Sequence, residues 1–79
     1  PKIGDRGISI LLKKMPDRLV ELGLVGCGMT DVAGLELLSW LKKNDQLRLL
    51  CIEENNFSNE LKLQFKSHAN LIKNFYLEI

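Results

Sequence analysis

Glycine, cysteine and histidine are the residue types whose spacing in this sequence first suggests chemistry. After an apolar run that starts at Leu22, the chain reads Gly26-x-Gly28 and then a helix-like segment, which is the order found in nucleotide-binding turns. A dinucleotide fingerprint would place a third glycine at position 31, but the sequence has Asp31, whose carboxylate repels a phosphate. The glycine pair is therefore expected to shape a turn.

The two cysteines and the single histidine are too few for a zinc site, and the cysteines do not form a CxxC pair. Reduced thiols are expected, with a lone Cys27–Cys51 disulfide as the alternative. Cys51 would need a base to act as a nucleophile, and His68 is expected in a helix on the far side of the sheet. Glu53 and Glu54 are adjacent and point apart, so they cannot share a proton. We expect no enzyme, metal or cofactor.

Composition limits the remaining classes of function. The 79 residues allow one small domain, and 46% hydrophobic with 27% charged residues is typical of a folded chain. With 11 basic and 10 acidic residues the net charge is +1, which argues against nucleic acid or a membrane surface as a partner. No targeting segment is recognised, so an intracellular, cytoplasmic location is expected, and the start at Pro1 favours a processed or cut chain.

The sequence contains an internal repeat. Leu19-x-x-Leu22-x-Leu24-x-x-Cys27-x-Met29-Thr30 recurs as Leu47-x-x-Leu50-x-Ile52-x-x-Asn55-x-Phe57-Ser58, with every member displaced by 28 positions. A weaker third copy, Ile72-x-x-Phe75-x-Leu77, follows at a spacing of 25. The segment from Ile3 to Lys14 matches the one from Met29 to Lys43, so the chain enters in mid-repeat.

Each repeat predicts a strand followed by a helix. The two-residue spacing of Leu22 and Leu24, repeated at Leu50 and Ile52 and at Phe75 and Leu77, places side chains on one face of a strand. Apolar residues at helical spacing lie between the strands, and Trp40 and Phe57 are expected in the core. Thr30 and Ser58 are predicted helix caps. The expected fold is α/β, with three helix-strand units and a small parallel sheet.

The repeat pattern resembles the leucine-rich-repeat family, and its length with cysteine at the turn is similar to the ribonuclease-inhibitor-like class. The resemblance implies a short solenoid with strands on the concave side and helices on the convex side. It also implies that Cys27 and Asn55 point inward and bond to the turn backbone. Residues 1–79 are then one domain or fragment, divided into a partial repeat (1–18), two repeats (19–46 and 47–71) and a terminal strand (72–79).

The concave strand face is the predicted site, because large side chains near polar groups are typical of protein-binding surfaces. The expected rows across it are Gly23, Cys51 and Tyr76; Glu21, Leu49 and Asn74; and Val25, Glu53 and Glu78. Members of the family commonly bind proteins, so the resemblance implies a protein-interaction module, such as a fragment of a sensor or effector.

Two other interpretations are kept. The irregular last repeat favours a structural C-terminal cap of a longer repeat protein with no binding role, because terminal repeats are usually atypical. The segment Leu71-Ile-Lys-Asn-Phe-Tyr76 is similar to the close of the tropomodulin repeat domain, which implies an actin-associated module. The exposed ends of the solenoid also favour a homodimer.

Overall fold

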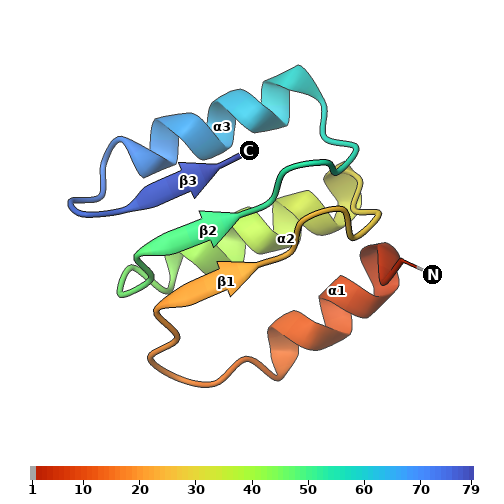
Figure 1. The fold of residues 1–79 in the computed structure, drawn as a ribbon, viewed down its shortest axis with the longest axis horizontal. Helices are drawn as coiled ribbons and strands as arrows, with labels where there is room; N and C mark the ends of the chain where they lie inside the picture. Colours follow the sequence, from red (N-terminus) through yellow and green to blue (C-terminus); the bar gives the residue numbers. More distant parts are fainter. Residues whose placement is uncertain (1) are drawn as a thin grey trace.

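The computed structural model describes residues 2–79 as a small α/β domain in which three helices alternate with three strands. The three strands lie side by side in one parallel sheet of order β1-β2-β3, and the helices are spread more widely than the strands (Figure 1). In chain order the elements are α1 (Gly4–Lys13), β1 (Glu21–Gly23), α2 (Asp31–Lys42), β2 (Leu49–Cys51), α3 (Asn59–Ala69) and β3 (Tyr76–Glu78). The predicted alternation of helix and strand is confirmed.

The register of the sheet departs from the sequence prediction at β3. Leu22 pairs with Leu50 at the predicted step of 28 positions, but Leu50 pairs with Leu77, a step of 27, and not with Phe75. The predicted step of 25 was therefore wrong by two positions. Side chains alternate with a period of two along a strand, so a shift by two keeps the same residues on the core side and leaves the apolar pattern unchanged.

The core lies between the sheet and the helices. The fully buried side chains include Leu50 of β2 and the following Ile52, Leu37 and Leu41 of α2, and Phe65 of α3. Such side chains each gain about 1.5–3 kcal/mol from leaving water, which is the main driving force for this arrangement. The helix stripes predicted from apolar spacing therefore do face the sheet.

The two predicted core aromatics occupy different depths. Phe57 is buried, and its ring centroid lies 5.9 Å from that of Phe65. Trp40 is half-buried and packs against the edge of the core. The prediction is therefore confirmed in full for Phe57 and in part for Trp40.

Helices α2 and α3 begin at the predicted caps. The Thr30 hydroxyl accepts a hydrogen bond from the Val32 amide, and the Ser58 hydroxyl accepts one from the Leu61 amide. Both bonds satisfy amides that have no partner within the first turn. Within residues 2–79, none of the helices combines the length and the apolar character that crossing a bilayer requires.

Close contact between α2 and α3 depends on Gly34. A Cβ atom at this position would lie 2.6 Å from Leu61 Cδ2 and 2.7 Å from Phe57 Cε1, distances that side chains do not tolerate. Counted from the capping residues, the place of Gly34 in α2 is taken by Lys62 in α3. At this position α2 therefore has no side chain between it and α3, whereas α3 has the long side chain of Lys62 at the equivalent position.

Candidate functional site

The glycine pair after β1 forms a tight turn whose amides are already bonded. Gly26 and Gly28 have φ values of +60° and +77°, a region that residues with a Cβ rarely adopt. The Gly26 amide donates to the Glu53 carbonyl at 2.9 Å, and the Cys27 amide donates to the Asn55 side chain at 3.1 Å. These amides are engaged by the next turn of the chain, so they are not aimed at a phosphate.

The side chain of Asn55 joins two turns that are 28 residues apart. Its Oδ1 accepts hydrogen bonds from the amides of Cys27 and Met29, at 3.1 and 3.0 Å. Its Nδ2 donates to the Leu24 carbonyl at 2.9 Å and to the carbonyl of Ile52 in its own turn at 3.1 Å. The expected inward role is thus confirmed for Asn55, and it extends to the neighbouring turn.

Cys27, at the equivalent position one repeat earlier, makes a weaker contact. Its Sγ lies 3.7 Å from the Val25 carbonyl. A thiol is a weak donor and a weak acceptor, so it cannot bridge as many backbone groups as an amide. Cys27 and Cys51 are both free thiols in the structure.

Two aspartates form a second set of links between the units, which the sequence analysis missed. Asp5 accepts from the Thr30 amide at 2.7 Å and from the Thr30 hydroxyl at 2.5 Å, and the Ser58 amide donates to Asp31 at 2.8 Å. The hydrogen bonds from Thr30 lower the pKa of Asp5, and those from Ser58 lower the pKa of Asp31. The available signal was an acidic residue in the first turn of successive helices.

The predicted site residues of the sheet lie on the side away from the core, in rows that differ from those expected. We call this surface the open sheet face. The pairing aligns Glu21 with Leu49 and Tyr76, and it aligns Gly23 with Cys51 and Glu78. Tyr76 was expected beside Cys51 and Glu78 beside Glu53, so both expectations were wrong by one row, for the reason given above for β3.

Asn74 does not belong to these rows. It precedes β3 in the loop that follows α3, with a φ of +56°, and its side chain is exposed. Asparagine adopts this left-handed conformation more readily than most residues. Asn74 therefore serves to turn the chain into β3, and its predicted place beside Leu49 was wrong.

The other predicted positions border the open sheet face. Glu53 follows β2 and is half-buried, and Val25 follows β1 and is exposed. The Glu53 carbonyl accepts from the Gly26 amide, which continues the contact between these two chain segments beyond the sheet. The face therefore extends from Glu21 at one end of the strands to Glu53 at the other.

Cys51 lies among the carboxylates of the open sheet face. Partial desolvation raises the pKa of its thiol, and the negative charges of Glu53, Glu78 and Glu21 raise that pKa further. The thiol is therefore held in its protonated, less nucleophilic form. In the sheet register Glu78 pairs with Cys51, and Glu53 follows Cys51 by two residues, so acidic residues lie beside the middle of this face.

The candidate base, His68, lies in α3, whereas Cys51 faces away from the helices. His68 is half-buried, and its Nε2 is buried with no hydrogen-bond partner among residues 2–79. The helical position predicted for this histidine is confirmed. In the described part of the chain, no group of three or more histidine, cysteine, aspartate or glutamate side chains is placed to hold a metal ion.

The open sheet face combines apolar and acidic side chains. It presents an aromatic ring, a half-buried aliphatic side chain and several carboxylates on a short sheet that is fixed by the core behind it. Comparisons of the chain with protein-family models, with curated proteins and with solved structures give no match.

Proposed function

We propose that the chain is a non-catalytic protein-interaction module of the leucine-rich-repeat type that binds a protein partner through the open sheet face. Two observations support the repeat class. The units follow one another at steps of 28 and 27 residues, and the Asn55 side chain links successive turns as the family resemblance implies. The strand face opposite the helices is left for a partner.

The observation that carries the proposal is the alignment of Leu49 with Tyr76. The two are direct neighbours across β2 and β3, and Tyr76 is 73% exposed although it is a large aromatic residue. Tyrosine supplies apolar area together with a hydroxyl group, which is why it is enriched among residues that dominate binding energy. Leu49 beside it widens the apolar centre.

The charges around this centre indicate the partner's chemistry. Glu21 pairs with Leu49, and Glu78 pairs with Cys51, so carboxylates border the apolar centre along the strands. A surface with an apolar centre and basic groups around it complements this arrangement, and charge complementarity of this kind speeds association and selects the partner. We therefore propose a partner with a basic, partly apolar surface, in the cytoplasm.

The test compares three versions of the chain in affinity capture from cytosolic extract. The double variant Leu49→Ser, Tyr76→Ser removes the apolar centre, and the control Leu35→Ser changes a leucine on α2 that is 53% exposed but lies away from the sheet. Circular dichroism and urea unfolding establish that each variant is folded. A protein retained by the parent chain and by Leu35→Ser, but not by the double variant, supports the proposal.

The captured partner is then purified and titrated at increasing salt. Binding that weakens with salt is expected, because the carboxylates contribute through screened electrostatic attraction. Equal capture by all three versions, or binding that does not depend on salt, contradicts the proposed surface.

A second candidate function is a structural cap at the C-terminal end of a longer repeat array. Lys62 and Lys66 of α3 favour it, because they stand where α2 has Gly34 and the buried Leu38. Terminal repeats carry a polar outer face that keeps the end of the array from associating. The variant Lys62→Leu, Lys66→Leu is then expected to self-associate in sedimentation experiments; a monomeric variant would contradict the cap.

A further inference from the structure

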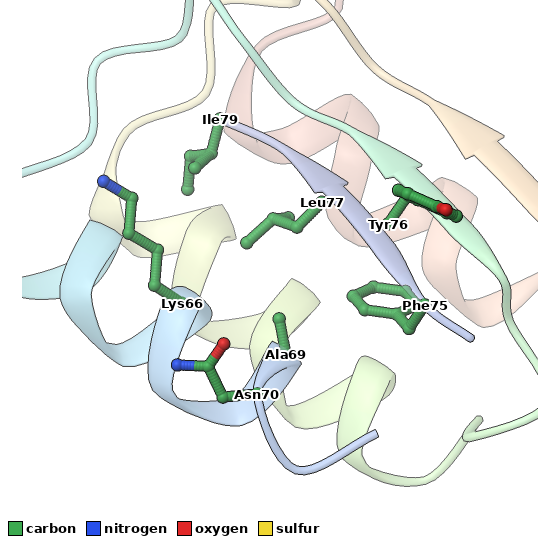
Figure 2. Close-up of a pocket in the computed structure, with 7 residues that line it drawn as sticks. All are labelled: Lys66, Ala69, Asn70, Phe75, Tyr76, Leu77 and Ile79. Atoms are coloured by element: carbon green, nitrogen blue, oxygen red, sulfur yellow. The ribbon is translucent and has the colours of Figure 1, made fainter. Parts of the chain in front are cut away.

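A groove lies between α3 and β3 at the edge of the sheet, and it meets the open sheet face at Tyr76. It has a volume of about 240 Å³. We call it the edge groove. The end of α3 lines it with Lys66, Ala69 and the adjoining Asn70, and β3 with its flanking residues lines it with Phe75, Tyr76, Leu77 and Ile79 (Figure 2). In this view Leu77 and Ile79 point from β3 toward the helix, so the floor of the groove is apolar.

The backbone of β3 forms one wall of the edge groove. The Tyr76 amide donates to the Arg48 carbonyl at 2.9 Å, and the Glu78 carbonyl accepts from the Ile52 amide at 2.8 Å, so both residues face β2. Backbone groups of successive residues in a strand point to opposite edges, so the amide and carbonyl of Leu77 point away from β2. Since β3 is the last strand of the sheet, these groups can pair with an added strand.

The shape of α3 decides what can be added at this edge. Between α2 and α3, close approach needs Gly34, where a Cβ would already contact Phe57 and Leu61 at less than 3 Å. At the equivalent position α3 has Lys62, and one turn later it has Lys66 where α2 has a buried leucine. A further helix cannot approach α3 as α3 approaches α2. A single strand avoids this obstacle because it lies against β3 and over the groove.

The edge of the groove carries positive charge. Lys66 lines it and is exposed, whereas Glu21 and Glu78 lie on the open sheet face. An acidic side chain on the added strand would meet Lys66 at the rim of the groove. The apolar floor accepts side chains at every second position of such a strand, because these share one face.

We propose that the edge groove binds an extended peptide as a fourth strand, with apolar side chains over Leu77 and Ile79 and an acidic side chain near Lys66. This is β-augmentation, in which the backbone supplies affinity and the alternate side chains supply selectivity. The site shares Tyr76 with the open sheet face, but it is argued from the free backbone edge of β3 and the apolar floor, and it does not rest on the proposed function.

The first experiment measures binding of a fluorescein-labelled hexapeptide, Thr-Val-Thr-Val-Thr-Asp, by fluorescence anisotropy up to millimolar concentrations of the chain. Two further peptides carry N-methyl groups either on the threonine amides or on the valine amides. An added strand turns one set of amides toward β3 and the other toward solvent, so one methylated peptide should keep its affinity and the other should lose it. If the parent peptide does not bind, or if both methylated peptides bind equally, the proposal is overturned.

The second experiment uses variants of the chain. Lys66→Glu is expected to weaken binding of the acidic peptide by about fivefold, which is the order expected for a surface ion pair. Lys62→Glu makes the same charge change outside the groove lining, and Leu49→Ser changes the open sheet face; both should leave peptide affinity unchanged. Equal weakening by Lys66→Glu and Lys62→Glu would mean that only net charge matters, which overturns the site.

A second copy of the chain is the alternative occupant. Analytical ultracentrifugation of the chain alone distinguishes it, since a dimer dispersed by the peptide would assign the edge to self-pairing, whereas a monomer that binds the peptide supports the proposal. A dimer that the peptide does not disperse overturns it. Loss of partner capture in the Leu49→Ser, Tyr76→Ser variant with peptide binding retained by Leu49→Ser would separate this site from the proposed function.

Discussion

Replacing Asn55 by alanine tests how successive turns are held together. The substitution removes a side chain that accepts from the amides of Cys27 and Met29 and donates to the carbonyl of Leu24, all at 2.9–3.1 Å. These three backbone groups belong to the preceding repeat, and alanine offers them no partner. The carbonyl of Ile52 loses its bond to the same side chain.

The magnitude follows from the number of groups left without a partner. A buried polar group that loses its hydrogen bond costs about 1–3 kcal/mol. The turn is only partly buried, so water reaches some of these groups and the low end of this range applies to each. For the three groups of the preceding repeat, we expect Asn55→Ala to lower the free energy of unfolding by about 3 kcal/mol. In a domain of this size that is a fall of about 10–25 °C in Tm.

The matched control is Asn56→Ala. Asn56 is exposed, and its backbone amide, which donates to the Met29 carbonyl, is kept in the variant. Surface substitutions of this kind change stability by less than about 0.5 kcal/mol. Urea unfolding followed by circular dichroism measures both variants, and the slope of the transition shows whether the comparison is sound.

Hydrogen exchange locates the effect. In Asn55→Ala the amides of Cys27 and Met29 should exchange much faster than in the parent chain, while the Leu24 amide, which donates to the Cys51 carbonyl at 2.8 Å, should change only in proportion to global stability. Equal urea midpoints for Asn55→Ala and Asn56→Ala, or uniform exchange throughout the chain, would refute the reasoning.

Three other predictions follow from the helix starts, the helix contact and the open sheet face. The hydrogen bonds to Asp5 lower its pKa below the unfolded value of 3.8, so ionised Asp5 stabilises the fold above pH 3.8, and this stabilisation is lost as pH falls through the folded pKa. Asp5→Asn should therefore be less stable than the parent chain at pH 7 in urea titrations. The difference in stability should vanish in strong acid. Gly34→Ala should lower the free energy of unfolding by about 1–3 kcal/mol despite the better helix propensity of alanine. Gly23→Ala should be nearly neutral, because a Cβ at position 23 meets no other atom within 4 Å. Thermal unfolding compares the two variants, and equal Tm values would contradict the close contact of Gly34 with Phe57 and Leu61. Glu53→Gln should speed alkylation of Cys51 by iodoacetamide at pH 8, since a nearby negative charge raises the pKa of the thiol; an unchanged rate, followed by mass spectrometry, would contradict that influence.

The sequence predicted the elements well where two signals agreed. The repeat of Leu22, Leu24 and Cys27 as Leu50, Ile52 and Asn55 established both the strands and the turn that follows them, and the structure confirms that alignment for β1 and β2. The capping hydroxyls gave the starts of α2 and α3. In each case an apolar period and a residue with a specific hydrogen-bonding role predicted the same boundary.

The register of β3 had only one signal. Phe75, Leu77 and Ile79 alternate on the core side, so the apolar pattern fits equally well when it is shifted by two positions. The missing information was the backbone of the preceding loop, where Asn74 has a positive φ. This error moved Tyr76 and Glu78 by one row each, which changed the neighbours of Leu49 and of Cys51 on the open sheet face.

The edge groove required knowledge of contacts that the sequence does not contain. When the sequences of α2 and α3 are aligned, Lys62 occupies the position equivalent to Gly34, but the alignment alone does not tell which face of the helix Gly34 occupies. The Cβ distances to Phe57 and Leu61 supply that fact. With these distances, the difference between Gly34 and Lys62 indicates which kind of element can pack against α3.

The two layers of the fold end differently at this edge, and that difference connects the two proposals. On the helix side, α3 has Lys62 and Lys66 where α2 has Gly34 and Leu38, so α3 lacks the glycine that lets α3 approach α2 closely. On the sheet side, β3 still presents the backbone of Leu77, and its open face still presents Tyr76. A partner that adds a strand at this edge would also extend the row of Glu21, Leu49 and Tyr76, because strands in register continue each row. Peptide binding at the edge should therefore strengthen capture of a partner by the open sheet face, whereas two independent surfaces would show no such coupling.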